Sequence, residues 1–172
     1  MNAADLKNIQ APLKEKYRED ATAALITLNA TGKIGENISC RIDTSHAMIE
    51  AGLHPATGGS GLQACSGDLL LQALVACAGV TMSAVATAIG IEIIDGSVKA
   101  EGDLDFRGTL GVSKEVAVGI QSIRLIFNLQ TAASDEQVKT LLNLTERYCV
   151  VYQTLAKGVA VNVLCENDPV QD

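Results

Sequence analysis

The chain has 172 residues, a net charge of −7 and 48% apolar residues, but it contains only two Phe, three Tyr and no Trp. This length suits one domain, which buries roughly 70% of the surface that the unfolded chain exposes. An acidic chain with so few rings offers neither the cations that bind phosphates nor the platforms that stack on bases. The composition therefore excludes nucleic acid as the expected partner and requires a core of small aliphatic side chains.

Charged residues interrupt the N-terminal segment from Lys7 onward, so it has no apolar stretch of the kind found in secretory signals. We therefore expect a cytoplasmic protein. Thiols are mostly reduced in that compartment, and an odd number of cysteines at irregular spacings is a poor disulfide framework. The five cysteines are Cys40, Cys65, Cys77, Cys149 and Cys165.

The N-terminal part of the chain predicts a helix followed by a hairpin. Apolar residues spaced by three or four predict a helix over residues 12–19, with Pro12 in its first turn because a proline deeper inside would remove a hydrogen bond. Alternating polar and apolar residues then predict strands over 26–31 and 37–43, joined by a turn at 31–35.

A glycine-rich loop over 52–61 leads into 21 residues without a formal charge, 69–89, which are enough to span a bilayer. Six alanines, four polar side chains and the lack of nearby Lys or Arg argue against a membrane segment. We expect instead a long central helix, buried on all sides, in a protein without a membrane partner. Ser66 is its predicted N-cap, Asp68 complements its positive end, and Gly90 follows its last turn.

The clearest strand covers residues 98–107, where apolar side chains alternate with charged ones. Its expected partner begins at Val116. The apolar positions of that partner change parity near Gln121 and Ser122, which predicts a β-bulge.

Ser134 and the glutamine three positions later form the pattern of a capping box, which begins a predicted helix that ends near Tyr148. A last short strand is predicted over 159–163. Hairpins with inserted helices favour an α+β fold over a doubly wound parallel sheet. We expect one domain over residues 1–172, with residues 1–20 as a helical extension.

Motifs for nucleotide, metal or serine chemistry do not explain this sequence, which matches no P-loop, dinucleotide fingerprint, zinc-protease helix or nucleophile elbow. The glycines at 58–61 precede a helix and could cradle an anion, although a flexible loop is their commoner use. His46, His54 and Cys65 lack the close pairing of zinc ligands. We expect no metal and no bound cofactor.

Two thiols are better candidates for chemistry. Cys149 lies 11 positions after Val138 on its predicted helix, which places the two within about 20° of one another around the axis, so Cys149 faces inward. Cys77 lies in the middle of the apolar central helix. Two such helices could bring these thiols to disulfide distance. Buried cysteines also serve as small hydrophobes, so from the pattern alone both interpretations stay open.

Two motifs carry a family resemblance. The run GDLLLQALVACAGVTM at 67–82 and the run ERYCVV at 146–151 resemble the OsmC/Ohr family, osmotically inducible protein C-like and organic hydroperoxide resistance proteins. In that family the first cysteine lies on a long central helix and the second ends a later helix. The resemblance implies an OsmC-like α+β fold, with antiparallel sheets packed on the long central helix, in an intertwined homodimer.

The resemblance also implies a function, a thiol-dependent peroxidase that reduces organic hydroperoxides. Cys77 would attack the peroxide and become a sulfenic acid, and Cys149 would resolve it to a Cys77–Cys149 disulfide. An external dithiol or lipoyl-type reductant would then reopen that bond. The alternative is a protein of the same fold that binds a small hydrophobic ligand, or senses redox state, without significant turnover.

A thiol in apolar surroundings needs a positive neighbour to ionise. The family takes an arginine from its N-terminal hairpin, and here Lys33 and Arg41 are both candidates. A carboxylate holds that arginine, but its usual position is occupied by Gly67. Asp68, one residue later, is a candidate carboxylate and is equally well explained as an N-terminal helix charge.

Two further positions depart from the family pattern, and three cysteines lie outside the candidate pair. Ser66 and Val150 stand where the family often has proline, and we expect neither to touch the thiols. Cys65 precedes a helix N-terminus, where a thiol is activated, or it simply fills space in the loop. Cys40 and Cys165 are expected to be structural.

Overall fold

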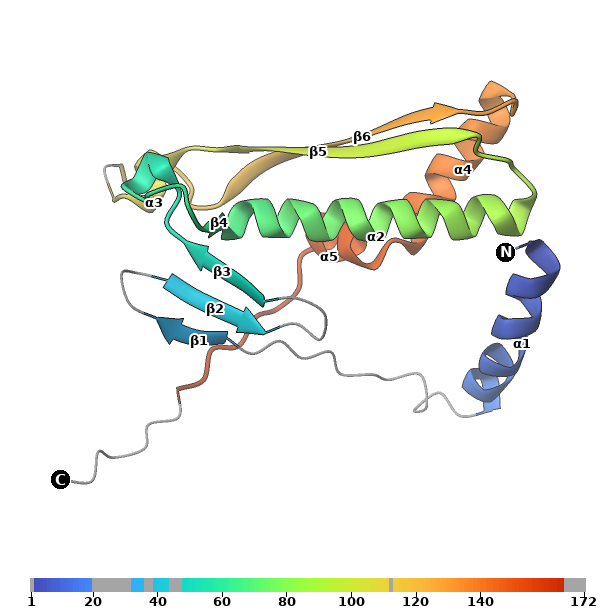
Figure 1. Cartoon of the computed structure of the whole chain (residues 1–172), viewed down its shortest axis with the longest axis horizontal. Coiled ribbons are helices and arrows are strands. Elements are labelled where there is room, and N and C mark those ends of the chain that lie inside the picture. The colour runs from blue at the N-terminus through green and yellow to red at the C-terminus, as the bar shows by residue number, and fades with distance from the viewer. Residues whose placement is uncertain (1, 20–31, 36–38, 44–47, 112, 166–172) are drawn as a thin grey trace.

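The computed structural model describes residues 2–19, 32–35, 39–43, 48–111 and 113–165. The elements in chain order are α1 (Ala3–Glu19), β1 (Gly32–Gly35), β2 (Ser39–Asp43), β3 (Met48–Gly52), the 3-10 helix η2 (Pro55–Thr57), β4 (Ala64–Cys65), α2 (Ser66–Ile89), β5 (Asp95–Leu104), α3 (Phe106–Thr109), β6 (Ile120–Gln130), α4 (Asp135–Tyr148) and α5 (Val150–Lys157). Two separate sheets and inserted helices make the fold α+β, as the sequence predicts (Figure 1).

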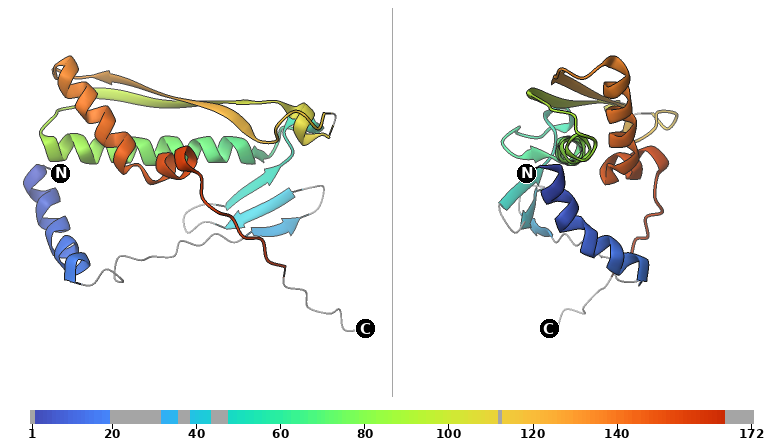
Figure 2. Two further views of the ribbon diagram at one scale, coloured as in Figure 1. Left: turned by 180° about the vertical axis from the view of Figure 1, so that it is seen from behind. Right: turned by 90° about the vertical axis from the view of Figure 1, so that its right-hand side faces the viewer.

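The 24-residue helix α2 is the spine of the fold, and at 1.5 Å per residue it is about 36 Å long. Cys65, rather than the predicted Ser66, occupies the N-cap position, and its side chain makes no capping hydrogen bond. Asp68 lies in the first turn and Gly90 ends the helix in the left-handed region at φ 74°, both as predicted. Viewed end-on, α2 lies below the β5–β6 sheet and beside α4 and α5 (Figure 2).

The antiparallel pair β5–β6 covers one side of α2. At Gly102 a Cβ atom would lie 3.2 Å from Ile120 of β6 and 3.4 Å from Leu71 of α2, so the absence of a side chain leaves room for the packing of Ile120. The predicted bulge is confirmed, since Asp103 pairs with Ser122 but Leu104 pairs with Ile120.

The two strands differ from their predicted bounds. β5 has the predicted length but begins and ends three residues earlier, at Asp95 and Leu104, and β6 is shorter than predicted. β5 ends at Leu104 because the Asp105 side chain accepts a hydrogen bond from the backbone N–H of Arg107 and caps α3. β6 begins at Ile120 rather than Val116. The carbonyl of Val116 packs 2.8 Å from the position of a Cβ atom on Gly108, so this segment folds around α3 instead of pairing with β5.

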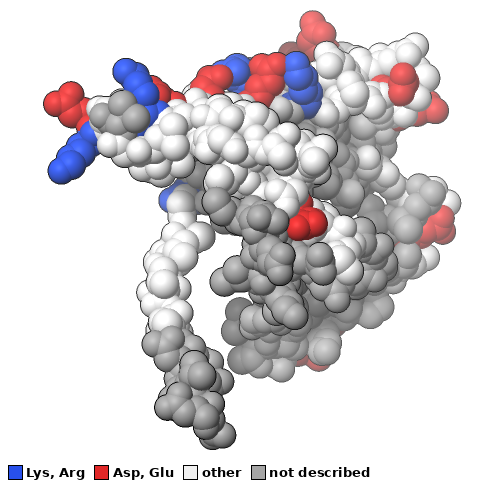
Figure 3. All heavy atoms as spheres, turned by 60° about the vertical axis from the view of Figure 1, so that its left-hand side comes forward, with Lys and Arg blue, Asp and Glu red and all other residues white. Residues whose placement is uncertain are grey.

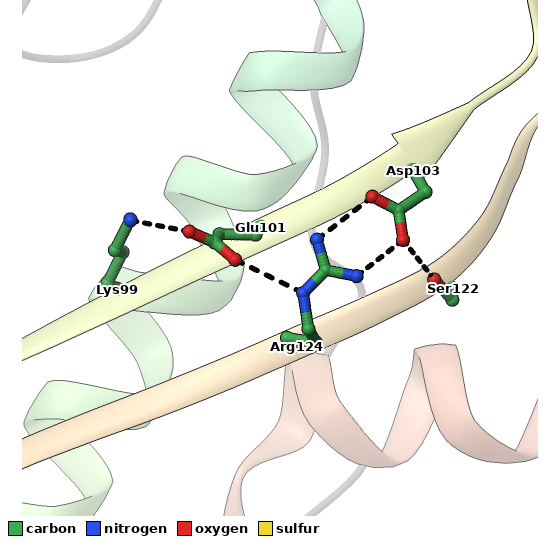
Figure 4. Close-up of polar contacts among 5 residues, drawn as sticks. All are labelled: Lys99, Glu101, Asp103, Ser122 and Arg124. Carbon is green, nitrogen blue, oxygen red and sulfur yellow. Dashed lines mark hydrogen bonds and ion pairs between the residues drawn. The ribbon is translucent and has the colours of Figure 1, made fainter.

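The solvent face of the β5–β6 sheet carries the predicted charges as one ionic cluster (Figure 4). Arg124 forms ion pairs with Asp103 and with Glu101, the latter at 3.1 Å. Lys99 lies 2.5 Å from Glu101, and Ser122 donates a 2.6 Å hydrogen bond to Asp103. Charged side chains gather along this edge of the molecule, whereas much of the described surface below it is uncharged (Figure 3).

The second sheet has the order β1-β2-β3-β4, with β3 and β4 parallel and the other pairs antiparallel. The predicted turn at 31–35 is wrong, because residues 32–35 form β1 and pair with β2 from Gly32↔Ile42 to Gly35↔Ser39. Glycines that indicate a turn are also tolerated in an edge strand, where the ladder needs only backbone groups. The predicted strand at 26–31 lies outside the described residues.

The core forms where α2 meets α4 beneath β6. Its buried residues are Met82, Val85, Ala86, Ile91 and Leu141, with Phe127 and Leu129 of β6 packed against them. The opposite face of α2 is open in the single chain, since Val80 is 72% exposed. The prediction of a helix buried on all sides is therefore wrong for one chain. By length and composition α2 also qualifies as a possible membrane span, a test that core helices of soluble proteins pass.

The two ends of the chain also differ from the predictions. α1 begins at Ala3, where reciprocal hydrogen bonds between Asn2 and Asp5 start the helix, so Pro12 lies inside it rather than in its first turn. The segment predicted as a strand over 159–163 pairs with no strand among the described residues, and Val163 in it is 89% exposed. Helix α5 was not predicted from the sequence.

Candidate active site

Cys149 lies at the junction of two helices. It is the C-cap of α4 and the N-cap of α5, with an extended backbone at φ −72°, ψ 109°. Its N–H donates to the Thr145 carbonyl and its carbonyl accepts from the Gln153 N–H, both at 2.9 Å. The break lets the chain change direction while both helices keep their terminal hydrogen bonds. The side chain faces inward as predicted, and the residue is 1% exposed.

The thiols of Cys77 and Cys149 meet, although they come from helices 72 positions apart in the chain. They are within hydrogen-bonding reach of one another, and the hydroxyl of Thr81, one turn further along α2, also contacts the Cys77 sulfur. Both cysteines are free. The structure thus brings together the two thiols that the sequence indicates as candidates for chemistry.

The pKa of Cys77 is lowered despite burial. Desolvation alone raises it, but hydrogen bonds from the backbone of Val151, from Cys149, from Thr81 and from the backbone of Val150 together outweigh that effect. The two backbone donors are the first N–H groups of α5, where a helix dipole favours negative charge. The positive neighbour that the chemistry requires is therefore supplied at least in part by a helix terminus.

Val150 corrects one expectation of the sequence analysis. We expected the residue after Cys149 not to touch the thiols, but its backbone N–H contacts Cys77. Proline has no N–H and could not make this contact. The departure from the family pattern therefore adds a donor at the reactive sulfur.

The pKa of Cys149 moves in the opposite direction. Burial raises it most, and the neighbouring Cys77 raises it further through its hydrogen bond and charge, while the backbone groups of Tyr152 and Val151 lower it less. Cys149 thus has the higher pKa of the two thiols and loses its proton after Cys77 as the pH rises. This asymmetry makes Cys77 the better nucleophile and Cys149 the proton-bearing partner.

The candidate cations are placed by their backbone alone, and the candidate carboxylate lies far from Cys77 along α2. Lys33 and Arg41 occupy directly paired positions of β1 and β2, but their side chains lie outside what the structure describes, so the choice between them stays a prediction. Asp68 is exposed in the first turn of α2. Nine residues separate it from Cys77, about 13 Å along the helix axis, so it does not touch that thiol within one chain.

Among the described residues, no other cysteine is one of the groups that shift the pKa values of Cys77 and Cys149. Cys65 is half-buried at the N-terminus of α2, and its sulfur lies 3.7 Å from where a Cβ atom of Gly67 would be. Cys165 is exposed in the single chain, and its structural role stays a prediction. The side chain of Cys40 lies outside the described residues.

The histidines do not form a metal site in the part of the chain that the structure describes. His54 caps η2 by accepting a 3.0 Å hydrogen bond from Ala56, and its ring stacks on Phe106 with centroids 4.9 Å apart. Among the described residues, no group of three His, Cys, Asp or Glu could hold a metal ion. His46 lies outside them.

A cavity of about 610 Å³ reaches α2 one helical turn from Cys77, although neither thiol lines it, and it was not anticipated from the sequence. It lies between β6 and the helices α4 and α5, and it touches α2 at Leu74, one turn before Cys77. Tyr152 of α5 also lines it, while the Tyr152 backbone contacts Cys149. The alternation of apolar residues over 120–127 indicates the wall that β6 forms. The opposite wall could not be predicted, because α5 was not.

Comparison with solved structures places this fold among OsmC-like proteins. An OsmC-like protein from Mycoplasma pneumoniae superposes with a TM-score of 0.65 at 19% identity, over 78% of this chain and 89% of that one. An organic hydroperoxide resistance protein OsmC from Legionella pneumophila gives 0.61 at 14%, over 76% and 91%. An organic hydroperoxide resistance protein from Elizabethkingia anophelis gives 0.61 at 19%, over 78% and 90%.

Sequence comparison gives the family directly. No curated protein sequence matches the chain significantly. The model of the OsmC-like protein family, however, matches residues 59–164, a range that contains both thiols, the cavity and α2. Since that match covers more than half of the chain, this protein belongs to the OsmC-like family.

Proposed function

We propose that this protein is a thiol-dependent peroxidase that reduces organic hydroperoxides. The observation that carries the proposal is the contact between Cys77, whose pKa is lowered by the N-terminus of α5, and the thiol of Cys149. The hydroperoxide resistance proteins of the same fold support it at the level of the family.

The reaction has two steps. The Cys77 thiolate attacks the terminal oxygen of the hydroperoxide, the O–O bond breaks, and the alkoxide takes a proton to leave as an alcohol. Cys77 is now a sulfenic acid. The Cys149 sulfur attacks it, the S–S bond forms, and hydroxide leaves with the Cys149 proton as water. An external dithiol or lipoyl-type reductant supplies the two electrons that restore both thiols, so no bound cofactor takes part.

We propose further that the protein works in the cytoplasm as a homodimer. The open apolar face of α2 and the exposed valines after α5, among them Val161 at 80% exposure, are surfaces that a second copy would cover. Sedimentation of the full chain tests this, and a monomer at micromolar concentration would contradict it.

The test of the enzymatic proposal is a stoichiometric addition of cumene hydroperoxide followed by peptide mapping of disulfides. We expect a Cys77–Cys149 link within seconds and continued peroxide consumption with a dithiol donor. Cys65→Ser is the matched control, since that thiol lies outside the pair and its loss should leave the rate unchanged. Undiminished consumption by Cys77→Ser would overturn the proposal.

A second candidate is a ligand-binding or redox-sensing protein of the same fold without significant turnover. Two residues favour this candidate. Gly67 has no carboxylate, and the exposed Asp68 is too far from Cys77 to hold an arginine beside it. This candidate predicts slow or absent disulfide formation in the same experiment, or a disulfide without catalytic turnover.

A further inference from the structure

The cavity one helical turn from Cys77 has an apolar body. Most of its wall is formed by apolar side chains that are branched or aromatic, and they include Leu74, Ile123, Leu125, Phe127, Leu142 and Leu155. Its volume of about 610 Å³ is in the range of small-molecule sites. A hydrocarbon chain placed here would lose its contact with water, which favours binding in proportion to the buried area.

One side of the cavity is polar. Gln121 and Ser122 of β6 line it together with Glu146 of α4 and Tyr152 of α5. The Tyr152 hydroxyl and the Glu146 carboxylate are 3.5 Å apart. Burial raises the pKa of Tyr152, and the adjacent Glu146 charge raises it further, which shows that this carboxylate acts on the cavity wall.

The charge of this wall has one sign. Glu146 is the one charged residue among the described residues that line the cavity. Arg124 of β6 is next to two lining residues and shares Asp103 as a partner with the lining residue Ser122, but its guanidinium is already paired with Asp103 and Glu101. A carboxylate headgroup in the cavity would thus meet a negative charge without a cation from the described walls to offset it.

We infer that this cavity binds neutral or cationic amphiphiles and rejects anionic ones, with Glu146 as the residue that sets this selectivity. The hydrocarbon part packs against Leu125 and Phe127, and a hydroxyl or ammonium group of the ligand donates to the Glu146 carboxylate. A carboxylate group offers no proton to donate and is repelled.

The position of the cavity connects this selectivity to the chemistry. Leu74 lies one helical turn before Cys77, and Tyr152 contacts Cys149 through its backbone. If the proposed function holds, on which this step rests, the preferred substrates are hydroperoxides of neutral lipids, such as fatty-acid esters, rather than hydroperoxides of free fatty acids.

Binding is tested without turnover, by titration calorimetry of the full chain with decanol, decylamine and decanoate at pH 7. We expect decanol and decylamine to bind at least tenfold more tightly than decanoate. Glu146→Gln keeps the shape of the side chain and removes its charge, so it should bring decanoate to within about threefold of decanol. Glu136→Gln, which removes the same charge from an equally exposed position of the same helix outside the cavity, should leave the wild-type ratio unchanged.

A second variant locates the site. Ala156→Phe adds a ring at an exposed position of α5 that lines the cavity, so the fold tolerates it while the cavity is filled. We expect decanol affinity to fall at least tenfold. Equal affinities of decanol and decanoate in the wild type, or unchanged decanol binding in Ala156→Phe, would overturn the assignment.

Turnover separates this inference from the proposed function. We expect kcat/KM for the methyl ester of linoleic acid hydroperoxide to exceed that for the free acid at least tenfold, and Glu146→Gln to reduce this ratio. Consumption of both at equal rates would overturn the substrate preference while the peroxidase proposal stands. Selective binding of decanol with no consumption of any hydroperoxide would overturn the peroxidase proposal and leave the cavity assignment intact.

Discussion

Two regions of this molecule stabilise charge by different means. On the solvent face of the β5–β6 sheet, Arg124 pairs with Asp103 and Glu101, full charges held in water. At the junction of α4 and α5, Cys77 is stabilised chiefly by neutral donors, the Cys149 thiol, the Thr81 hydroxyl and two backbone N–H groups. Water and salt screen the first arrangement, whereas the second acts in a partly dry site where each donor counts for more.

Substitutions in the two regions should affect function to different extents. An exposed ion pair gives up little when it is broken, because water solvates both partners well. Water cannot replace the hydrogen-bond donors of a thiolate between packed helices. Of the possible substitutions, only one to proline removes a backbone N–H donor. Function should therefore be sensitive to changes at the helix junction and insensitive to changes in the ionic cluster, although the cluster carries far more formal charge.

The largest effect is expected from the thiols themselves. Cys77→Ser should lower peroxidase turnover by about 10³-fold or more, because a serine hydroxyl is not ionised at neutral pH and cannot form a sulfenic acid. Cys149→Ser should still consume one equivalent of peroxide and then accumulate a sulfenic acid at Cys77. Labelling with dimedone and mass spectrometry distinguish the two variants. A Cys149→Ser protein that turns over at the wild-type rate would show that another group resolves the intermediate.

The second prediction concerns Val150, the backbone donor. Val150→Pro should preserve α5, since proline is well tolerated at the first position of a helix. It removes one N–H from Cys77, and a hydrogen bond to a charged group is worth about 1.5 kcal/mol, or about tenfold in rate.

The pH dependence fixes the sign of this effect. The reactive thiolate fraction falls as the pH drops through the Cys77 pKa, and the variant should have its midpoint at higher pH than the wild type. Iodoacetamide alkylation should therefore be about tenfold slower in Val150→Pro at pH values below both midpoints and converge with the wild type above them. Val150→Ala keeps the N–H and is the matched control. Superimposable pH profiles for the wild type, Val150→Pro and Val150→Ala would show that the N-terminus of α5 does not stabilise the Cys77 thiolate.

The sequence predicts the thiol pair but not what activates it. The helical positions of Cys77 and Cys149 follow from apolar periodicity, and the family resemblance pairs them. The eight residues of α5 give no comparable signal, because Cys149 interrupts the helix and the following apolar run reads equally as strand. The contribution of Val150 depends on a backbone group, which every residue type except proline offers.

In the rest of the fold as well, features that depend on side chains were predictable, whereas a strand that pairs only through backbone groups was not. The bulge near Gln121, the capping box at Ser134 and the cap at Gly90 were predicted correctly, because each depends on a side-chain pattern or a positive φ. β1 was mistaken for a turn, since its glycines pair through backbone groups alone. The exposed segment over 159–163 has the alternation of a strand but finds no pairing strand in the described chain.

The third prediction concerns Thr81, whose hydroxyl contacts the Cys77 sulfur from within α2. Thr81→Val keeps the shape of the side chain and removes one neutral donor, as Val150→Pro does, so alkylation of Cys77 below its midpoint should slow by about tenfold. Thr87→Val is on the same helix, and the Thr87 hydroxyl donates to the Ser83 carbonyl, so this control should leave the rate unchanged. An unchanged rate in Thr81→Val would show that the hydroxyl does not stabilise the Cys77 thiolate.

The smallest effect is expected from Arg124→Gln. Arg124, followed by Ser122, holds the pKa of Asp103 well below its usual range, so this pair contributes stability above the ordinary carboxyl pKa that is lost as the pH falls below it. The variant should unfold at a slightly lower urea concentration than the wild type at pH 7 and low salt. The difference should disappear in 1 M salt, where the screening length is about 3 Å, and again at strongly acidic pH. Cys77 alkylation should be unchanged throughout, since the cluster faces water on the side of the sheet away from α2. A slower alkylation rate in Arg124→Gln would mean that the two regions are coupled through β6, and the contrast between them would fail.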